Sequence, residues 1–161
     1  MRRFLKYWMP LFIWLGVIFI GSTDALSAEH TSRFLVPFLR WLDPHISWAA
    51  INTIHTAIRK LGHVIEYAIL AVLLWRALGG GKILRARPPI LFALVWFACA
   101  IFAASDEFHQ SFVPSRTSVS SDVLIDICGA LIGLAFCWVF AARKQEFDRE
   151  TRNLGRDPSS P

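Results

Sequence analysis

Ionisable side chains interrupt an apolar stretch in the first half of this chain, at a spacing that suits chemistry. Residues 59–67 read RKLGHVIEY, so that Lys60, His63 and Tyr67 recur at i, i+3 and i+7. In a helix this spacing places the three side chains on one face, and Glu66 can reach His63 along the same side. A histidine beside a carboxylate is typical of general acid–base chemistry, and a nearby lysine can bind phosphate.

Two further polar clusters flank later apolar stretches. One contains Asp106, Glu107, Gln110 and Arg116, and the other contains Asp122 and Asp126. Carboxylates and a histidine are candidate acids and bases, whereas an arginine and a lysine can hold a phosphate group together. The candidate catalytic residues are therefore His63, Glu66, Asp106, Glu107 and Asp122. The candidate substrate-binding residues are Lys60, Tyr67, Gln110, Arg116 and Asp126.

Each cluster also has a purely structural interpretation. Asp122, with Ser121 before it, can cap the start of a helix, and Lys60 can anchor a helix end at a membrane interface. Asp106 and Glu107 can simply end a helix in solvent. Together these interpretations predict a polar network that holds helices to one another by hydrogen bonds and does nothing else.

Glu66 and Asp126 fit the structural interpretation least well, because each lies about a turn or more inside its apolar stretch. An ionised group at membrane depth costs ~2.5–3.5 kcal/mol on insertion scales. Such a group must be paired or neutralised, and the cations at hand are Lys60, Arg116 and a protonated His63.

Four apolar stretches must position these clusters, at about residues 7–24, 60–78, 88–105 and 122–142. Each approaches the ~20 residues that a helix needs to cross a bilayer. Hydrophobic residues make up 55% of the 161 residues and charged residues 18%, a balance that soluble domains rarely reach. The sequence predicts an all-α integral membrane bundle of four transmembrane helices, one domain over residues 1–142, and a disordered cytoplasmic tail over 143–161.

Two segments extend beyond the membrane spans. The second helix is predicted to begin near Ser47, because no proline interrupts residues 47–78 and the first part of that segment is amphipathic. The segment FLVPFLRWL at 34–42 is too short to cross and carries Pro37 and Arg40. We therefore expect this segment to lie at the interface between helices one and two.

The first apolar stretch has two interpretations. Basic residues precede it and ALSA follows at 25–28, as in a signal peptide. Leucine occupies the position three back from a cut after Ala28, where cleavage requires a small residue. A retained helix is the favoured interpretation.

The positions of the basic residues predict an orientation. Twelve of the 17 Lys and Arg residues fall before the first stretch, between the second and third, or after the fourth. Such groups stay on the cytoplasmic side. We therefore expect a multi-pass protein of the inner (cytoplasmic) membrane with both termini in the cytoplasm, and the three polar clusters at the extracytoplasmic end.

Charge and cysteine placement disfavour two other classes of protein. The formal charge of +5 does not indicate nucleic-acid binding, because the basic residues form short groups beside apolar stretches and not one exposed face. Cys99, Cys128 and Cys137 lie inside apolar stretches with no partner at metal or redox spacing. They are interpreted as small buried hydrophobic residues.

The sequence contains no complete metal motif, and we assign no metal and no cofactor. One variant stays open. His63 with Glu66, and Asp106 with His109, are pairs at i, i+3 of the kind that helix bundles use to hold metals.

The three clusters together resemble the VanZ-like family of bacterial membrane proteins. The matching patterns are RKxxHxxEYxxL, DExxQxFxPxR and DxxxDxxGAxxG, starting at residues 59, 106 and 122. Their order, spacing and helical placement agree with the family over most of residues 55–140. The chain departs from the pattern at Asp126, where the family usually has Asn, and at Ser115, where it commonly has Gly.

The resemblance implies a membrane protein whose family is named for a protein that lowers susceptibility to the glycopeptide antibiotic teicoplanin. Two functions fit the residues. The first is an enzyme acting on a lipid or lipid-linked cell-envelope substrate, in which Lys60 and Arg116 hold the headgroup phosphate and His63 or Glu107 moves a proton. The alternative is a non-catalytic lipid- or glycolipid-binding protein, or an accessory protein that influences teicoplanin susceptibility.

The expected partner is a membrane lipid or a lipid-linked precursor. Gly129, Ala130 and Gly133 form a stripe of small residues on the fourth helix, where close helix packing is expected. Whether that packing lies within one chain or between two is open, so helix–helix self-association stays a possibility.

Overall fold

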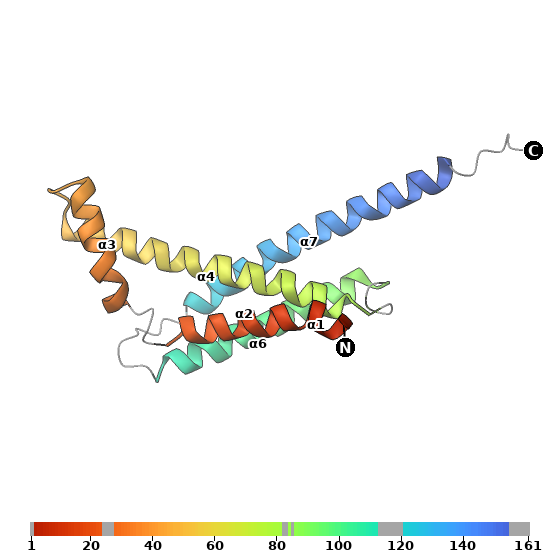
Figure 1. Ribbon diagram of the computed structural model, residues 1–161, viewed down its shortest axis with the longest axis horizontal. Coiled ribbons are helices and arrows are strands. Elements are labelled where there is room, and N and C mark those ends of the chain that lie inside the picture. The colour runs from red at the N-terminus through yellow and green to blue at the C-terminus, as the bar shows by residue number, and fades with distance from the viewer. Residues whose placement is uncertain (1, 24–27, 82–83, 85, 113–120, 155–161) are drawn as a thin grey trace, which may run out of the picture.

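The computed structural model describes residues 2–23, 28–81, 84, 86–112 and 121–154, most of which lie in helices. The helices are α1 (Arg2–Tyr7), α2 (Met9–Gly21), α3 (Ala28–Leu42), α4 (Trp48–Leu78), α6 (Pro88–Gln110) and α7 (Ser121–Leu154). Helices α2, α4, α6 and α7 run lengthwise through the molecule, and α3 lies across one end (Figure 1). The all-α prediction is confirmed.

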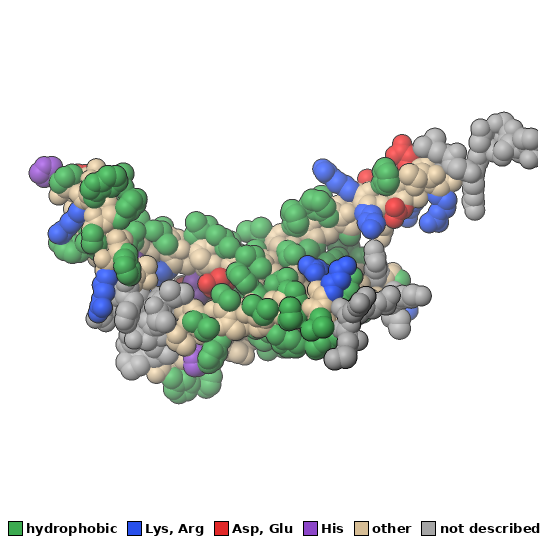
Figure 2. Space-filling view, viewed as in Figure 1, with side chains coloured by type: hydrophobic (Ala, Val, Ile, Leu, Met, Phe, Trp, Pro, Cys, Tyr) green, Lys and Arg blue, Asp and Glu red, His purple; other side chains and the backbone are tan. Residues whose placement is uncertain are grey.

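Four segments of the described chain are long and apolar enough to cross a membrane: Phe4–Gly21, Trp48–Leu78, Pro88–Gln110 and Ser121–Arg152. Their outer faces are apolar too, as expected for helices in contact with lipid. More than half of each of the side chains of Phe12, Phe97 and Phe136 is exposed. Hydrophobic side chains cover much of the visible bundle, with Lys and Arg towards its ends (Figure 2). The prediction of a four-helix membrane bundle is confirmed.

Local sequence signals set the helix ends. Pro10 lacks an N–H group, and α1 and α2 are separated at Trp8, two residues before it. The break is slight, because Phe12 N still donates to the Trp8 carbonyl at 3.0 Å. Ser47 caps α4 by accepting a hydrogen bond from Ala50 N at 3.2 Å, and α6 opens with two prolines in its first turn.

The largest helix–helix contact joins α4 to α7, and two glycines make it possible. A Cβ atom on Gly129 would lie 2.9 Å from Val64 Cα, and one on Gly133 would lie 3.0 Å from Ala68 Cα. Only glycine lets the two backbones approach this closely. The residue numbers of the contacting pairs increase together along the two helices, so α4 and α7 run parallel. The small-residue stripe is therefore occupied by α4 of the same chain, which accounts for it without a second copy.

Helix α7 continues past the expected end of the last span at residue 142 and stops at Leu154. The predicted disordered tail was wrong for residues 143–154. The physical reason is local, because this segment contains no Gly or Pro and pairs opposite charges at i, i+4, such as Asp148 with Arg152. The extension projects away from the rest of the bundle (Figure 1).

Helix α3 is longer than the segment 34–42 that was predicted to lie at the interface. Its large apolar side chains stay outside the core, with Phe34 82% and Trp41 79% exposed. The Arg40 guanidinium lies 4.6 Å from the ring centre of Trp48, which ties α3 to the start of α4. An amphipathic helix that crosses the end of the bundle suits the membrane interface, and that location stays a prediction.

The cysteines divide into two classes. Cys99 and Cys137 are buried, as predicted, but Cys128 is exposed, and its interpretation as a buried residue was wrong. Cys128 precedes Gly129 on α7, and a helix that aims Gly129 at α4 turns the preceding side chain outward.

Candidate functional site

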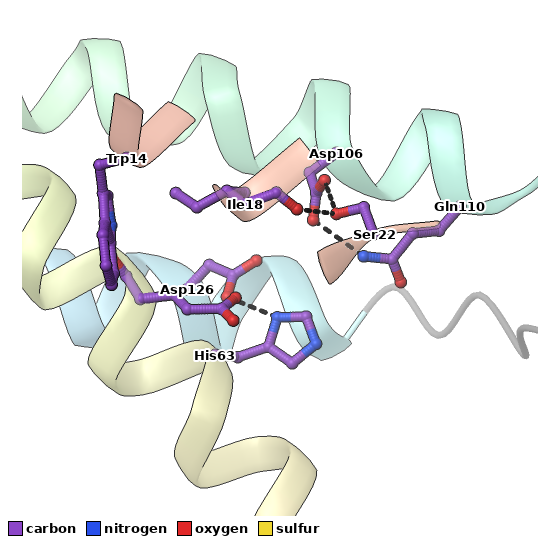
Figure 3. Close-up of polar contacts among 8 residues, drawn as sticks. Trp14, Ile18, Ser22, His63, Asp106, Gln110 and Asp126 are labelled. Atoms are coloured by element: carbon purple, nitrogen blue, oxygen red, sulfur yellow. Dashed lines mark hydrogen bonds and ion pairs between the residues drawn. The ribbon is translucent and has the colours of Figure 1, made fainter. Parts of the chain in front are cut away.

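A buried polar contact joins α4 to α7 inside the bundle. His63 Nδ1 lies 3.0 Å from Asp126 Oδ1 (Figure 3). Only 8% of His63 and 2% of Asp126 is exposed. Burying a carboxylate in an apolar bundle is costly unless a partner satisfies it, and His63 is that partner.

A second hydrogen-bonded group joins the end of α2 to the end of α6. The Ser22 hydroxyl bonds to Asp106 Oδ1 and also lies 3.0 Å from the Ile18 carbonyl oxygen (Figure 3). Gln110 Nε2 donates to Asp106 Oδ2 at 2.8 Å. Both carboxylate oxygens of Asp106 therefore accept hydrogen bonds, and Ser22 and Gln110 are buried beside it.

Tyr67 is near both groups. Its side chain is completely buried and lies near both Asp106 and Asp126. Among the described residues, neither the Tyr67 hydroxyl nor Gln110 Oε1 has a hydrogen-bond partner. Buried polar atoms in proteins are normally hydrogen-bonded, so these two atoms are exceptions to that rule.

A pocket of about 300 Å³ opens beside these residues, between α2 and α6. Its polar wall consists of Tyr67, Ser105, Asp106 and His109, and Phe19 and Phe102 contribute to its apolar wall. Tyr67 is fully buried whereas Phe19 is 57% exposed, so the pocket runs from the interior to the outer surface. The His109 ring stacks on Phe19 with ring centres 5.0 Å apart.

Two more acidic residues border the pair of His63 and Asp126. Asp122 is buried one turn earlier on α7, and Glu66 is half-buried one turn after His63 on α4. Both therefore lie near His63. Trp14 of α2 donates from Nε1 to the backbone carbonyl of Glu66 at 3.0 Å, which fixes the first helix against this part of α4.

The structure brings seven of the predicted residues together at one end of the bundle. Those assembled are His63, Glu66, Tyr67, Asp106, Gln110, Asp122 and Asp126. Lys60 is exposed and lines a separate surface hollow of about 420 Å³. Glu107 is half-buried on α6 and does not line the pocket. Arg116 lies outside the described residues.

Lys60 does not line the pocket, and the binding of a phosphate by Lys60 and Arg116 together stays a prediction. None of the described residues that line the pocket is Lys or Arg. The helical spacing from Lys60 to Tyr67 correctly selects one face of α4, but it does not tell which part of that face the other helices cover.

Sequence reasoning assigned the site to the second, third and fourth membrane helices and missed the first. Ser22 closes the first apolar stretch and supplies the hydroxyl bonded to Asp106. The available signal was its position, since a helix that alternates direction with the others ends at the same side as the polar clusters. His109 was considered only as a metal ligand, and its ring lines the pocket instead.

The described residues hold no group of three His, Cys, Asp or Glu side chains placed to share a metal ion. The residues considered as metal ligands lie in two separate places. His63 is bonded to Asp126, whereas Asp106 and His109 line the pocket between α2 and α6.

Comparison with known protein families places this arrangement in context. The family described as VanZ/LLP1 matches residues 7–141, a range that extends from the first membrane helix to the end of the apolar part of α7. Searches among curated proteins and among solved structures gave no match. The family match covers most of the chain and all three polar clusters, and the protein belongs to the VanZ-like family of membrane proteins.

Proposed function

We propose that this protein binds the polar headgroup of a membrane lipid, or of a lipid-linked cell-envelope precursor, in the pocket between α2 and α6. The observation that carries the proposal is that Tyr67 lines a pocket shared with the exposed ring of Phe19, while its buried hydroxyl has no hydrogen-bond partner among the described residues. A headgroup entering from the side of the bundle would bond to the polar wall. Its chains would stay against the apolar rim, as an amphipathic molecule requires.

The lining favours a headgroup that carries hydroxyl or amine groups over one recognised through its phosphate. The Asp106 carboxylate accepts hydrogen bonds and attracts an ammonium group, and the Tyr67 hydroxyl can donate and accept. A phosphate would be repelled by Asp106, and no described cation lines the pocket to offset that repulsion. At about 300 Å³ the pocket suits a headgroup and not whole acyl chains.

Lipid that remains bound during purification tests the proposal. The protein is extracted in mild detergent from its own membrane, and bound lipids are quantified by mass spectrometry for wild type, Tyr67→Phe and Asp106→Asn. Both variants should lose one lipid class that the wild type enriches. Tyr67→Phe should remain as stable as the wild type, because its hydroxyl has no partner among the described residues.

The matched control is Asp43→Asn, the same chemical change at an exposed turn between α3 and α4. This control should retain the enriched lipid in full. A wild-type sample that carries lipids only in the proportions of the surrounding membrane would refute the binding function, as would equal loss in Asp43→Asn.

A second candidate function is acid–base chemistry on the bound headgroup, and the pair of His63 and Asp126 favours it. The carboxylate 3.0 Å from Nδ1 fixes the orientation of the imidazole, the relation that activates histidine in many enzymes. The pair lies next to Tyr67 and not in the pocket wall, so proton transfer would pass through the phenol or through movement of the headgroup.

Activity and binding separate in one experiment. Purified wild type is incubated with the lipid that it enriches, and products are sought by mass spectrometry. The enzyme function predicts a product with wild type and none with His63→Gln, which keeps a hydrogen-bond donor for Asp126 and should still bind the lipid. If the wild type binds the lipid but forms no product, the binding function stands and the enzyme function is refuted.

We further propose that the protein lies in the cytoplasmic membrane with both termini inside. The support is the placement of most Lys and Arg residues beside the two termini and the turn at residues 79–81. Reporter fusions at this turn and at the turn near Asp43 should report opposite sides. If a fusion at residue 81 reports the outer side, the proposed orientation is wrong and the pocket lies at the cytoplasmic end of the bundle.

Family membership supports one cellular readout. If the protein acts as an accessory factor, its expression should change teicoplanin susceptibility, and Tyr67→Phe and Asp106→Asn should cancel the change in parallel with the loss of bound lipid. Unchanged susceptibility in the wild type would separate this chain from the activity for which its family is named.

A further inference from the structure

A second pocket, of about 440 Å³, lies at the end of the bundle opposite the polar site. Its walls include Tyr7 at the start of the first span, Trp75 and Arg76 in the last turn of α4, Pro88 at the start of α6, and Lys144 of α7. These are the positions at which the apolar stretches begin or end. The pocket therefore lies at the level where lipid headgroups meet the helices.

Arg76 is held in place at this pocket. Its Nη2 atom donates to the Lys6 carbonyl oxygen at 2.8 Å, and its guanidinium lies 5.6 Å from the ring centre of Tyr7. One of five N–H donors is used by this bond, which leaves a planar fork that matches phosphate geometry. Because the side chain is already ordered by two contacts, less conformational freedom is lost when an anion binds.

The charge of the lining favours an anion. Arg76 and Lys144 are both exposed cations on different helices, and Asp148 is the one carboxylate among the described residues that line the pocket. The Lys6 ammonium lies 5.6 Å from the Tyr7 ring and adds positive charge nearby. The buried side chain of Leu91 gives the pocket an apolar part. Charge and apolar surface together suit an acidic headgroup.

We propose that this pocket binds a phosphate group between Arg76 and Lys144, carried either by an anionic lipid or by a soluble anion. This site is independent of the headgroup pocket between α2 and α6. The two pockets differ in chemistry, since described cations line only the one at Arg76.

Native mass spectrometry of the full-length protein in detergent tests the proposal, with phosphatidylglycerol as the probe. Wild type should retain phosphatidylglycerol at one preferred site. Lys144→Gln and Arg76→Gln should each weaken binding roughly five- to tenfold, the effect of one cation near a charged headgroup. If Arg76→Gln disturbs the fold by removing the hydrogen bond to the Lys6 carbonyl oxygen, Lys144→Gln alone tests the proposal.

Arg143→Gln is the matched control, because Arg143 is the exposed cation next to Lys144 and does not line the pocket. This variant should bind as wild type does, and so should Tyr67→Phe from the other site. If millimolar inorganic phosphate displaces phosphatidylglycerol, the natural ligand is a soluble anion. If phosphatidylglycerol stays bound, the natural ligand is the lipid. The proposal is overturned if Arg143→Gln weakens binding as much as Lys144→Gln, or if neither pocket variant changes it.

Discussion

A single methyl group placed on Gly129 or Gly133 tests how the site is held together. Both glycines press on the α4 backbone, one at Val64 and the other at Ala68, and α4 carries His63 immediately before this contact. Replacement by alanine puts a Cβ atom against backbone atoms that cannot rotate away. The two helices must therefore separate along their shared length.

The size of the effect follows from the distances. A Cβ atom added at residue 129 would lie 2.9 Å from Val64 Cα and closer still to the Val64 carbonyl oxygen, so reaching the 3.4 Å at which ordinary contact begins requires a separation of at least about 0.5 Å. A gap of about 0.5–1 Å forfeits about a quarter to a half of the attraction of each affected atom pair. Overpacking costs about 1–3 kcal/mol, and the better helix propensity of alanine returns up to about 1 kcal/mol. We expect each substitution to destabilise the fold by about 1–2 kcal/mol.

The double variant should cost less than the sum of the two single variants. Gly129 and Gly133 are one turn apart on the same interface, so one separation of the helices relieves both overlaps. The assay is unfolding in mixed micelles of increasing SDS fraction, followed by tryptophan fluorescence and far-UV circular dichroism.

Gly16→Ala and Gly62→Ala are the controls, because a Cβ atom on either glycine meets nothing within 4 Å. These variants should be as stable as wild type or up to about 1 kcal/mol more stable. Equal stability of Gly129→Ala and wild type would refute the close approach of α4 and α7. A loss in Gly62→Ala that matches the loss in Gly129→Ala would show that any added methyl group is harmful.

Three further predictions concern the polar site and the tail. Asp126→Asn keeps an acceptor for His63 and should cost less than 1 kcal/mol, whereas Asp126→Ala should cost about 1–3 kcal/mol in the same SDS titration; similar losses in both would contradict the pairing. Ser22→Ala removes a hydrogen bond to Asp106 and should cost about 1 kcal/mol, with no loss expected for Ser105→Ala, whose hydroxyl bonds to its own helix. Deleting residues 143–161 should lower the helical circular-dichroism signal per mole of chain, and an unchanged signal per mole would show that the extension of α7 is not helical.

Periodicity and composition were enough to predict the membrane helices and the end at which polar residues gather. They could not predict which residues would become partners. Glu66 is the carboxylate nearest to His63 in sequence, yet the hydrogen bond is to Asp126, which approaches because Gly129 lets α7 lie against α4. Such a partner depends on how two helices cross, and the spacing within one helix does not contain that information.

Two other differences have similar origins. Lys60 lies on the same face of α4 as His63, and no pattern within α4 tells where the covering helices leave that face open. Ser22 is an ordinary residue at the end of an apolar stretch, and its importance comes only from the approach of Asp106. Helix propensity alone predicts the extension of α7 beyond residue 142. The high charge of the same segment also indicates disorder, and the disorder prediction rested on that weaker indication.

The unbroken course of α7 has a mechanical consequence. From Asp126 to Leu154 the helix spans about 42 Å, and beyond Gly133 it contains neither glycine nor proline that would act as a joint. A torque applied to the projecting end is therefore carried along α7 as far as Gly133, where the helix packs against α4. A molecule fused or docked at that end would be held on a stiff rod at a set distance from this contact.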